Sequence, residues 1–197
     1  MDLLRRIILF IFIFGGFNSY SQNIIFDRPG VAETPYIPAK NHFHIELGED
    51  FFQSEALEYK TQVPSFLLRF NILNAIDLRF QYGYSLYTFN WLQKVSKDSD
   101  PYAMSVKIPF YNTKDSSLSM AMLYNHKLGF SEFNSINNGH DFIFTAQKNF
   151  KRLSINVNLG YLEYWELDNY YLLATCFSSK VLPKVELFAE PYFYYTP

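Results

Sequence analysis

Apolar and polar residues alternate with a period of two along several stretches of this chain. In residues 65–73 and 76–87 the even-numbered positions are apolar, and in residues 153–161 the odd-numbered positions are apolar. Polar or small residues occupy most of the positions between them. Because successive side chains of a β-strand point to opposite faces, each stretch is predicted to be a strand with one apolar and one polar face.

The same pattern, followed along the chain, predicts an all-β protein of antiparallel up-and-down strands with little helix. Nine strands are expected, at residues 42–53, 64–73, 76–87, 102–112, 117–126, 141–149, 153–163, 170–178 and 184–195. Each is close to the roughly 9–11 residues that a tilted strand needs to cross a bilayer.

Two architectures fit this alternation. In a soluble sandwich or barrel the apolar face points into the core, whereas in an outer-membrane barrel it meets lipid and the polar face lines the lumen. Three features favour the membrane barrel. Aromatic residues gather near strand ends, the polar face carries charges suited to a wet lumen, and long connections alternate with short ones. The expected long connections are 54–63, 88–101, 127–140 and 164–169, and the short ones are 74–75, 113–116, 150–152 and 179–183.

The hairpin around Asn74 allows a prediction of register. The apolar residues are even-numbered on both of its strands, so Ile72 must lie opposite Ile76, with Asn74 at positive φ in an odd-numbered loop. The same register places Arg69 opposite Arg79 and Asn71 opposite Asp77. Asp77 is then expected to relieve the repulsion between the two arginines.

Composition excludes several classes. The 197 residues are 49% hydrophobic, 20% aromatic and 18% charged, which is not the composition of a disordered chain. A formal net charge of −2 gives no electrostatic footprint for nucleic acid. The single cysteine, Cys176, permits neither an intrachain disulfide nor a cysteine-based zinc site, and we interpret it as a packing residue.

The first residues have the pattern of a secretory signal. Arg5 and Arg6 precede the apolar run 7–14, and Ser19 and Ser21 are the small residues of a cleavage site. The apolar run is short of the about 20 residues that a membrane-spanning helix needs. The expected organisation is a signal peptide (1–21), an extended segment that plugs the barrel or lies at its periplasmic end (22–41), and an outer-membrane β-barrel (42–197).

Several motifs resemble a known family. They are Phe26-Asp27-Arg28-Pro29-Gly30, Ala32-Glu33-Thr34-Pro35, Leu67-Leu68-Arg69-Phe70 with Asp77-Leu78-Arg79, and Glu190-Pro191-Tyr192. The chain is similar to the outer-membrane transporters named for the meta-pathway of phenol degradation, which occur in Gram-negative bacteria. The resemblance covers residues 26–87 well and 184–194 weakly. It implies a β-barrel that moves small, aromatic or hydrophobic molecules.

The chain departs from that family in three ways. Thr34 stands where the family normally has Ser, and Asn71-Ile72 stand where it has Gly-Leu. Nine strands is an odd number, whereas single-chain bacterial barrels have an even one. We therefore expect an incomplete barrel with further strands beyond residue 197, and the competing interpretation is a miscounted strand.

Three groups of residues are candidates for a functional site. Charged residues of the polar face could form a constriction that selects permeants or a salt-bridged filling that closes the lumen; these are Arg69, Asp77, Arg79, Lys107, Glu186 and Glu190. The residues preceding the first strand could plug the lumen or cap it, and these are Asp27, Arg28 and Glu33. His42, His44 and Glu46 alternate on the first strand and are weak candidates for a metal site.

Catalytic motifs are lacking in the sequence, and only His126 with Ser119 or Ser131 could be assembled into a hydrolase-like site. The sequence thus predicts a non-enzymatic outer-membrane transporter or channel without a cofactor, whose partners are outer-membrane lipid and a small-molecule permeant. One alternative is a structural barrel with a closed lumen. The other is a soluble secreted barrel that binds an apolar ligand.

Overall fold

A computed structural model of the chain describes residues 31–52, 59–72, 75–89, 94–99, 102–128, 139–164, 169–182 and 185–197. The predicted signal peptide, Asp27, Arg28, Asn74 and Ser131 lie outside these residues.

The described residues form one antiparallel sheet of twelve strands, and no helix occurs among them. The strands are β1 (Phe43–Phe52), β2 (Tyr59–Ile72), β3 (Ile76–Tyr82), β4 (Tyr84–Phe89), β5 (Lys94–Ser99), β6 (Tyr102–Asn112), β7 (Leu118–Leu128), β8 (Gly139–Asn149), β9 (Leu153–Tyr164), β10 (Tyr170–Leu182), β11 (Val185–Ala189) and β12 (Tyr192–Tyr195). The prediction of an all-β, antiparallel, up-and-down fold is confirmed.

Six of these strands lie end to end in pairs. Strands β3 and β4 follow one another along β2. On their other side, β3 pairs with β6 and β4 pairs with β5. At the far end of the sheet, β11 and β12 both pair with β10. Within the described ranges, the sheet therefore has nine successive strand positions, and each contains one of the nine predicted strands. The predicted loop 88–101 is wrong in its extent, because β5 and the end of β4 continue the hairpin through part of it.

Proline and glycine mark the interruptions. Pro64 has no N–H, and near it the partner of β2 changes from β4 at Gln62 to β3 at Phe66. Gly83 separates β3 from β4 on the facing strand. Pro191 separates β11 from β12, and its carbonyl accepts a hydrogen bond from the Thr175 N–H at 3.0 Å.

The predicted hairpin register is confirmed. Ile72 pairs with Ile76, and the same pairing places Arg69 opposite Arg79. A register shift of one residue would exchange the two faces of the strand, so the polar residues of β2 and β3 share one face because of this pairing.

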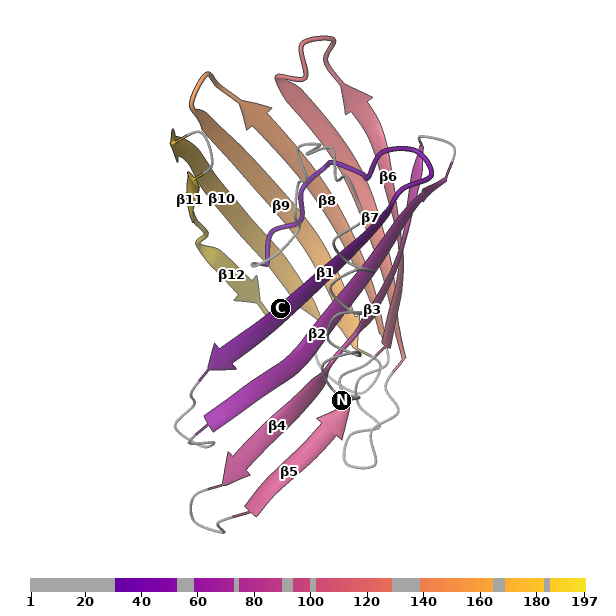
Figure 1. Cartoon of the computed structure of the whole chain (residues 1–197), viewed down its shortest axis with the longest axis vertical. Coiled ribbons are helices and arrows are strands. Elements are labelled where there is room, and N and C mark those ends of the chain that lie inside the picture. The colour runs from indigo at the N-terminus through magenta and orange to yellow at the C-terminus, as the bar shows by residue number, and fades with distance from the viewer. Residues whose placement is uncertain are drawn as a thin grey trace, which may run out of the picture.

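The sheet curves, and the segment before β1 lies against its concave side (Figure 1). Strand β1 pairs with β2, whereas β11 and β12 pair with β10, so the first and last strands of the described sheet are not joined. The sheet is therefore open, where the sequence predicted an incomplete barrel.

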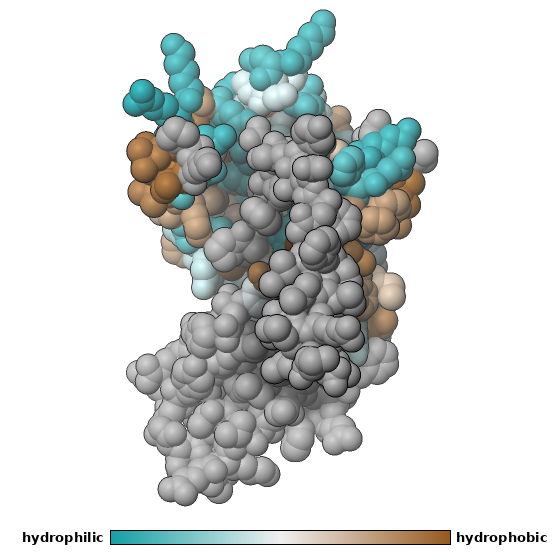
Figure 2. All heavy atoms as spheres, in the orientation of Figure 1, coloured by the Kyte–Doolittle hydropathy of each residue, from teal (hydrophilic) through white to brown (hydrophobic). Residues whose placement is uncertain are grey.

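Short turns join β6 to β7 and β8 to β9 at one end of the molecule, and Figure 2 shows hydrophilic side chains gathered at that end with hydrophobic ones on the flanks below. In the first turn Ser116 has a φ of 52°, and its N–H donates to the Thr113 carbonyl at 2.8 Å. Hydrogen bonds from the side chain of Thr113 and from Ser117 lower the pKa of Asp115 to about 2.

Candidate functional site

The sheet buries its polar face and exposes its apolar face. Arg69 is 1% exposed and Lys107 is fully buried, whereas Leu78 is 40% and Leu159 54% exposed. The buried polar residues come from strands across the sheet: Glu46, Arg69, Asn71, Asp77, Arg79, Ser105, Lys107, Ser119, Asp141, Thr145, Asn156 and Asn158. In a water-soluble domain this arrangement would be reversed, because buried charges are costly and large apolar patches are normally covered.

Arg69 is the centre of the first group of charges on this face. Its guanidinium lies 3.2 Å from a Glu46 carboxylate oxygen and 2.8 Å from the Asp77 carboxylate, and it donates to the Tyr36 carbonyl at 2.8 Å. The Nε of Arg69 also donates to the Asp77 carboxylate at 2.9 Å, so Asp77 neutralises the first of the two arginines that the register places opposite one another.

Glu33, from the segment before β1, is the centre of a second group. Arg79 donates to both carboxylate oxygens of Glu33, at 2.7 and 3.1 Å. The Lys107 ammonium donates to the same carboxylate at 2.9 Å. A bidentate arginine and a lysine on one carboxylate form a strong set of charge-assisted hydrogen bonds.

The main chain around Glu33 is held as well. The Glu33 N–H donates to the Asn158 side chain at 2.9 Å. The Glu33 carbonyl accepts from Thr145 at 2.6 Å and from Asn156 at 2.9 Å, and the Thr34 carbonyl accepts from Lys107 at 2.9 Å. Side chains of β3, β6, β8 and β9 thus contact one residue of this segment.

The flanking residues fix both ends of the segment. Pro38 accepts a hydrogen bond from the Asn71 side chain, and the Tyr36 hydroxyl accepts one from Asn149 at 2.6 Å. At the other end the Val31 N–H donates to Glu190. Ala32 packs in a small apolar cluster with three residues of the strands: Leu162, Leu172 and Ala174. We call residues 31–38 the lumen segment, a name taken from the barrel that the sequence predicts.

The structure brings together four of the six predicted charges of the polar face: Arg69, Asp77, Arg79 and Lys107. Glu190 lies apart from them and contacts the lumen segment at Val31. Glu186 is exposed on β11, opposite Lys180. Sequence reasoning missed Thr145. Along β8 the residues Asp141, Ile143 and Thr145 alternate with two phenylalanines, so the pattern alone places Thr145 on the same side as Asp141.

His42, His44 and Glu46 do not form a metal site. His42 precedes β1 and its ring nitrogen lies 2.9 Å from the Lys40 carbonyl, while Glu46 binds Arg69. In the parts of the chain that the structure describes, no three side chains of His, Cys, Asp or Glu converge as metal ligands.

His126 and Ser119 do not form a catalytic pair. They lie seven positions apart along β7, an odd number, which places them on opposite faces of the sheet. Ser119 bonds Asn112 at 3.0 Å, whereas His126 stacks on His140 of the neighbouring strand with their rings 4.8 Å apart.

An aromatic row crosses the exposed face. Its members pair in turn across β7, β8, β9, β10 and β12, and they are Tyr124, Phe142, Tyr161, Tyr171 and Tyr195. On the side of the aromatic row that is farther from the short turns, the neighbouring row begins with polar residues, which are His126, His140 and Glu163. On the side nearer the short turns, the neighbouring row is apolar and consists of Met122, Phe144, Leu159, Leu173 and Phe193. The aromatic row is thus the border between a polar and an apolar band.

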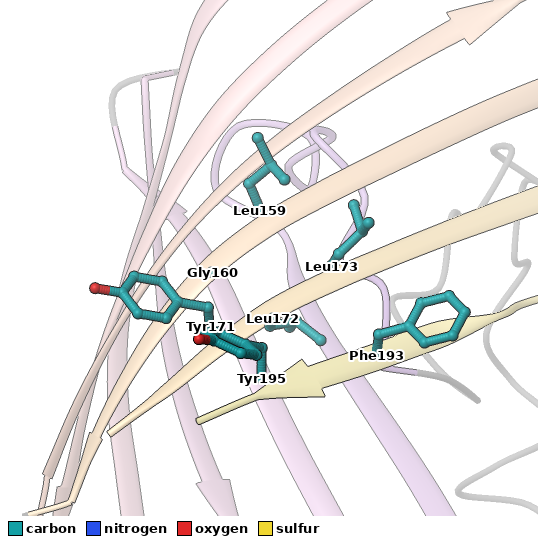
Figure 3. A pocket seen from close by; sticks show the side chains of 7 residues that line it. All are labelled: Leu159, Gly160, Tyr171, Leu172, Leu173, Phe193 and Tyr195. Atoms are coloured by element: carbon teal, nitrogen blue, oxygen red, sulfur yellow. The ribbon is translucent and has the colours of Figure 1, made fainter. Parts of the chain in front are cut away.

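An open apolar pocket of about 330 Å³ lies on the exposed face at the end of this row (Figure 3). Its outward-facing side chains come from β9, β10 and β12: Leu159, Tyr171, Leu173, Phe193 and Tyr195. Gly160 forms part of its wall, and a Cβ there would lie 3.1 Å from the Leu172 Cβ.

Comparison with protein-family models, curated proteins and solved structures finds no match. The resemblance to the phenol meta-pathway transporters therefore stays a prediction from the motifs. Among the residues that the structure describes, no helix has the length and hydropathy to cross a bilayer.

Proposed function

We propose that the protein is an outer-membrane β-barrel protein that forms a conduit for small molecules, with the lumen segment as its plug. The observation that carries the proposal is the orientation of the sheet: charged residues are buried on the concave face and large apolar residues are exposed on the other. Lipid covers such an apolar face without cost, and a wet or side-chain-filled lumen accommodates the charges.

The aromatic row supports the same proposal. Tyrosine is favoured where a ring can contact acyl chains and its hydroxyl can contact headgroups or water. The Tyr124 hydroxyl lies 2.7 Å from His140, at the polar side of the row, while Met122 and Phe144 lie on the apolar side. The predicted export signal at residues 1–21 is consistent with this location.

A structural barrel with a closed lumen is the second candidate, and it is favoured by the lumen segment itself. Residues 31–38 contact strands across the width of the concave face, from Arg69 on β2 to Asn158 on β9. A soluble barrel that holds an apolar ligand inside is disfavoured, because that function needs an apolar interior.

Two experiments test these functions. Fractionation and heat-modifiable gel migration locate the protein, and recovery in the soluble periplasmic fraction would refute the membrane assignment. Liposome swelling then compares the full chain with a variant in which residues 31–38 are replaced by a glycine–serine linker. We expect faster solute entry with the linker variant. If both proteins fold and neither admits solute, the closed structural barrel is the correct function.

A further inference from the structure

We propose that Glu33 occupies a carboxylate-binding site of the lumen wall, and that the permeant carries a carboxylate which takes its place. This inference rests on the proposed function and names the substrate class for it. The segment then acts as an internal competitor of the solute.

The first argument is the number of independent contacts to one residue. Arg79 and Lys107 bind the carboxylate of Glu33, while Asn158, Thr145 and Asn156 bind its N–H and carbonyl groups. Side chains of the strands therefore bind each polar group of Glu33: its carboxylate, its N–H and its carbonyl. A solute with a carboxylate and a nearby amide can make the same contacts.

The second argument is charge. Arg69 has Glu46 and Asp77 as direct partners, whereas Arg79 and Lys107 share the carboxylate of Glu33. Among the residues that the structure describes, Glu33 supplies a negative charge to both of these buried cations, so its departure makes the surroundings of Arg79 and Lys107 more positive. Because uncompensated buried charge is costly, an anion is favoured as the replacement over a neutral solute.

The third argument is access. The Glu33 side chain is 19% exposed, whereas its partners Arg79 and Lys107 are 3% and 0% exposed. The anion is thus the solvent-facing member of the group, and the cations belong to the fixed wall. A solute that reaches this position would meet the carboxylate of Glu33 before the buried cations.

Chemical rescue tests the site directly. Glu33→Ala empties the carboxylate position in the full-length protein, and the heat-unfolding midpoint in detergent is measured with sodium acetate or acetamide at constant ionic strength. We expect acetate to raise the midpoint and to bind at least about tenfold more tightly than acetamide, since hydrogen bonds to an ionised group are roughly twice as strong as those between neutral groups. N-acetylglutamate amide should bind more tightly than acetate.

Two controls decide the interpretation. Glu163→Ala makes the same change on the opposite face, so its midpoint should not respond to acetate. Adding both Arg79→Met and Lys107→Met to Glu33→Ala should abolish the rescue, because these two residues supply all the donors to the carboxylate that the structure shows. Equal effects of acetate and acetamide, or rescue that persists without Arg79 and Lys107, would overturn the carboxylate site.

A second variant keeps the test decisive if Glu33→Ala fails to fold. Glu33→Gln preserves volume and removes the charge, and swelling of liposomes is measured with acetate and with acetamide. We expect the variant to raise acetate entry selectively relative to the wild type, and an equal rise for both solutes would contradict the inference. Rescue without any solute entry would retain the binding site and refute the conduit. Solute entry without rescue or selectivity would retain the conduit and refute the carboxylate site.

Discussion

Replacing Arg69 with methionine tests whether the buried charges hold the sheet and the lumen segment together. The guanidinium contacts three elements: Glu46 on β1, Asp77 on β3 and the carbonyl of Tyr36 in the lumen segment. Methionine fills much of the same volume but supplies neither charge nor donors. The two carboxylates then remain on the buried face without their main partner.

The expected loss follows from that burial. The side chains of Glu46 and Asp77 are 2% and 0% exposed, so water does not replace the lost partner. Removing one member of a buried ion pair typically costs about 3–5 kcal/mol of unfolding free energy. Arg69→Lys keeps the charge and loses the planar fork, so a smaller cost of about 1–2 kcal/mol is expected.

Equilibrium urea unfolding of the protein refolded into vesicles measures these differences, with gel migration reporting the folded fraction. Arg152→Met is the matched control, because Arg152 is exposed at a short turn and should change the free energy by no more than about 0.5 kcal/mol. A loss for Arg69→Met that equals the control would refute the idea that these contacts stabilise the fold.

Three further predictions concern the exposed face, a close backbone approach and pH. Leu159→Arg should cost about 2–4 kcal/mol in vesicles and His140→Arg about 0–1 kcal/mol, because the cost of a cation depends on its depth in lipid; equal costs would argue against the proposed border. Gly160→Ala should cost about 1–3 kcal/mol, since its Cβ would lie 3.1 Å from that of Leu172. That cost should fall in a Leu172→Gly background, because glycine removes the Cβ that the added methyl group would meet; additive losses in the double-mutant cycle would show that this contact is not the cause. The lowered pKa of Asp115 predicts stabilisation that is complete well above pH 3.8 and lost as the pH falls toward about 2. An NMR titration of its carboxyl carbon checks this, and a midpoint at or above 3.8 would contradict it.

The candidate site was only partly predictable. The alternation placed Arg69, Asp77, Arg79 and Lys107 on one face, and the hairpin register placed the first three beside one another. The ion pair between Arg79 and Glu33 joins residues 46 positions apart, and Asn158 binds Glu33 across 125 positions. Such contacts depend on how the sheet curves around the lumen segment, and local periodicity carries no information about curvature.

Errors in the sequence interpretation have similar causes. Strand β5 has the sequence KVSKDS, which lacks alternation, so it was expected to be loop and is a strand because β4 pairs with it. Glu46 was a candidate metal ligand with His42 and His44, and it became a partner of Arg69 through the pairing of β1 with β2. In both cases the neighbouring strand decided the outcome.

By itself the sequence determined the strands, their up-and-down order and the two faces of each, because side-chain direction in a strand repeats every two residues. Periodicity is the same whichever face is buried, so it could not decide the orientation of the sheet. The tertiary structure decided that the charged face turns inward against residues 31–38 and that the apolar face turns outward. The physical reason is that buried charges need partners, and Glu33 supplies one for Arg79 and Lys107 from a distant part of the chain.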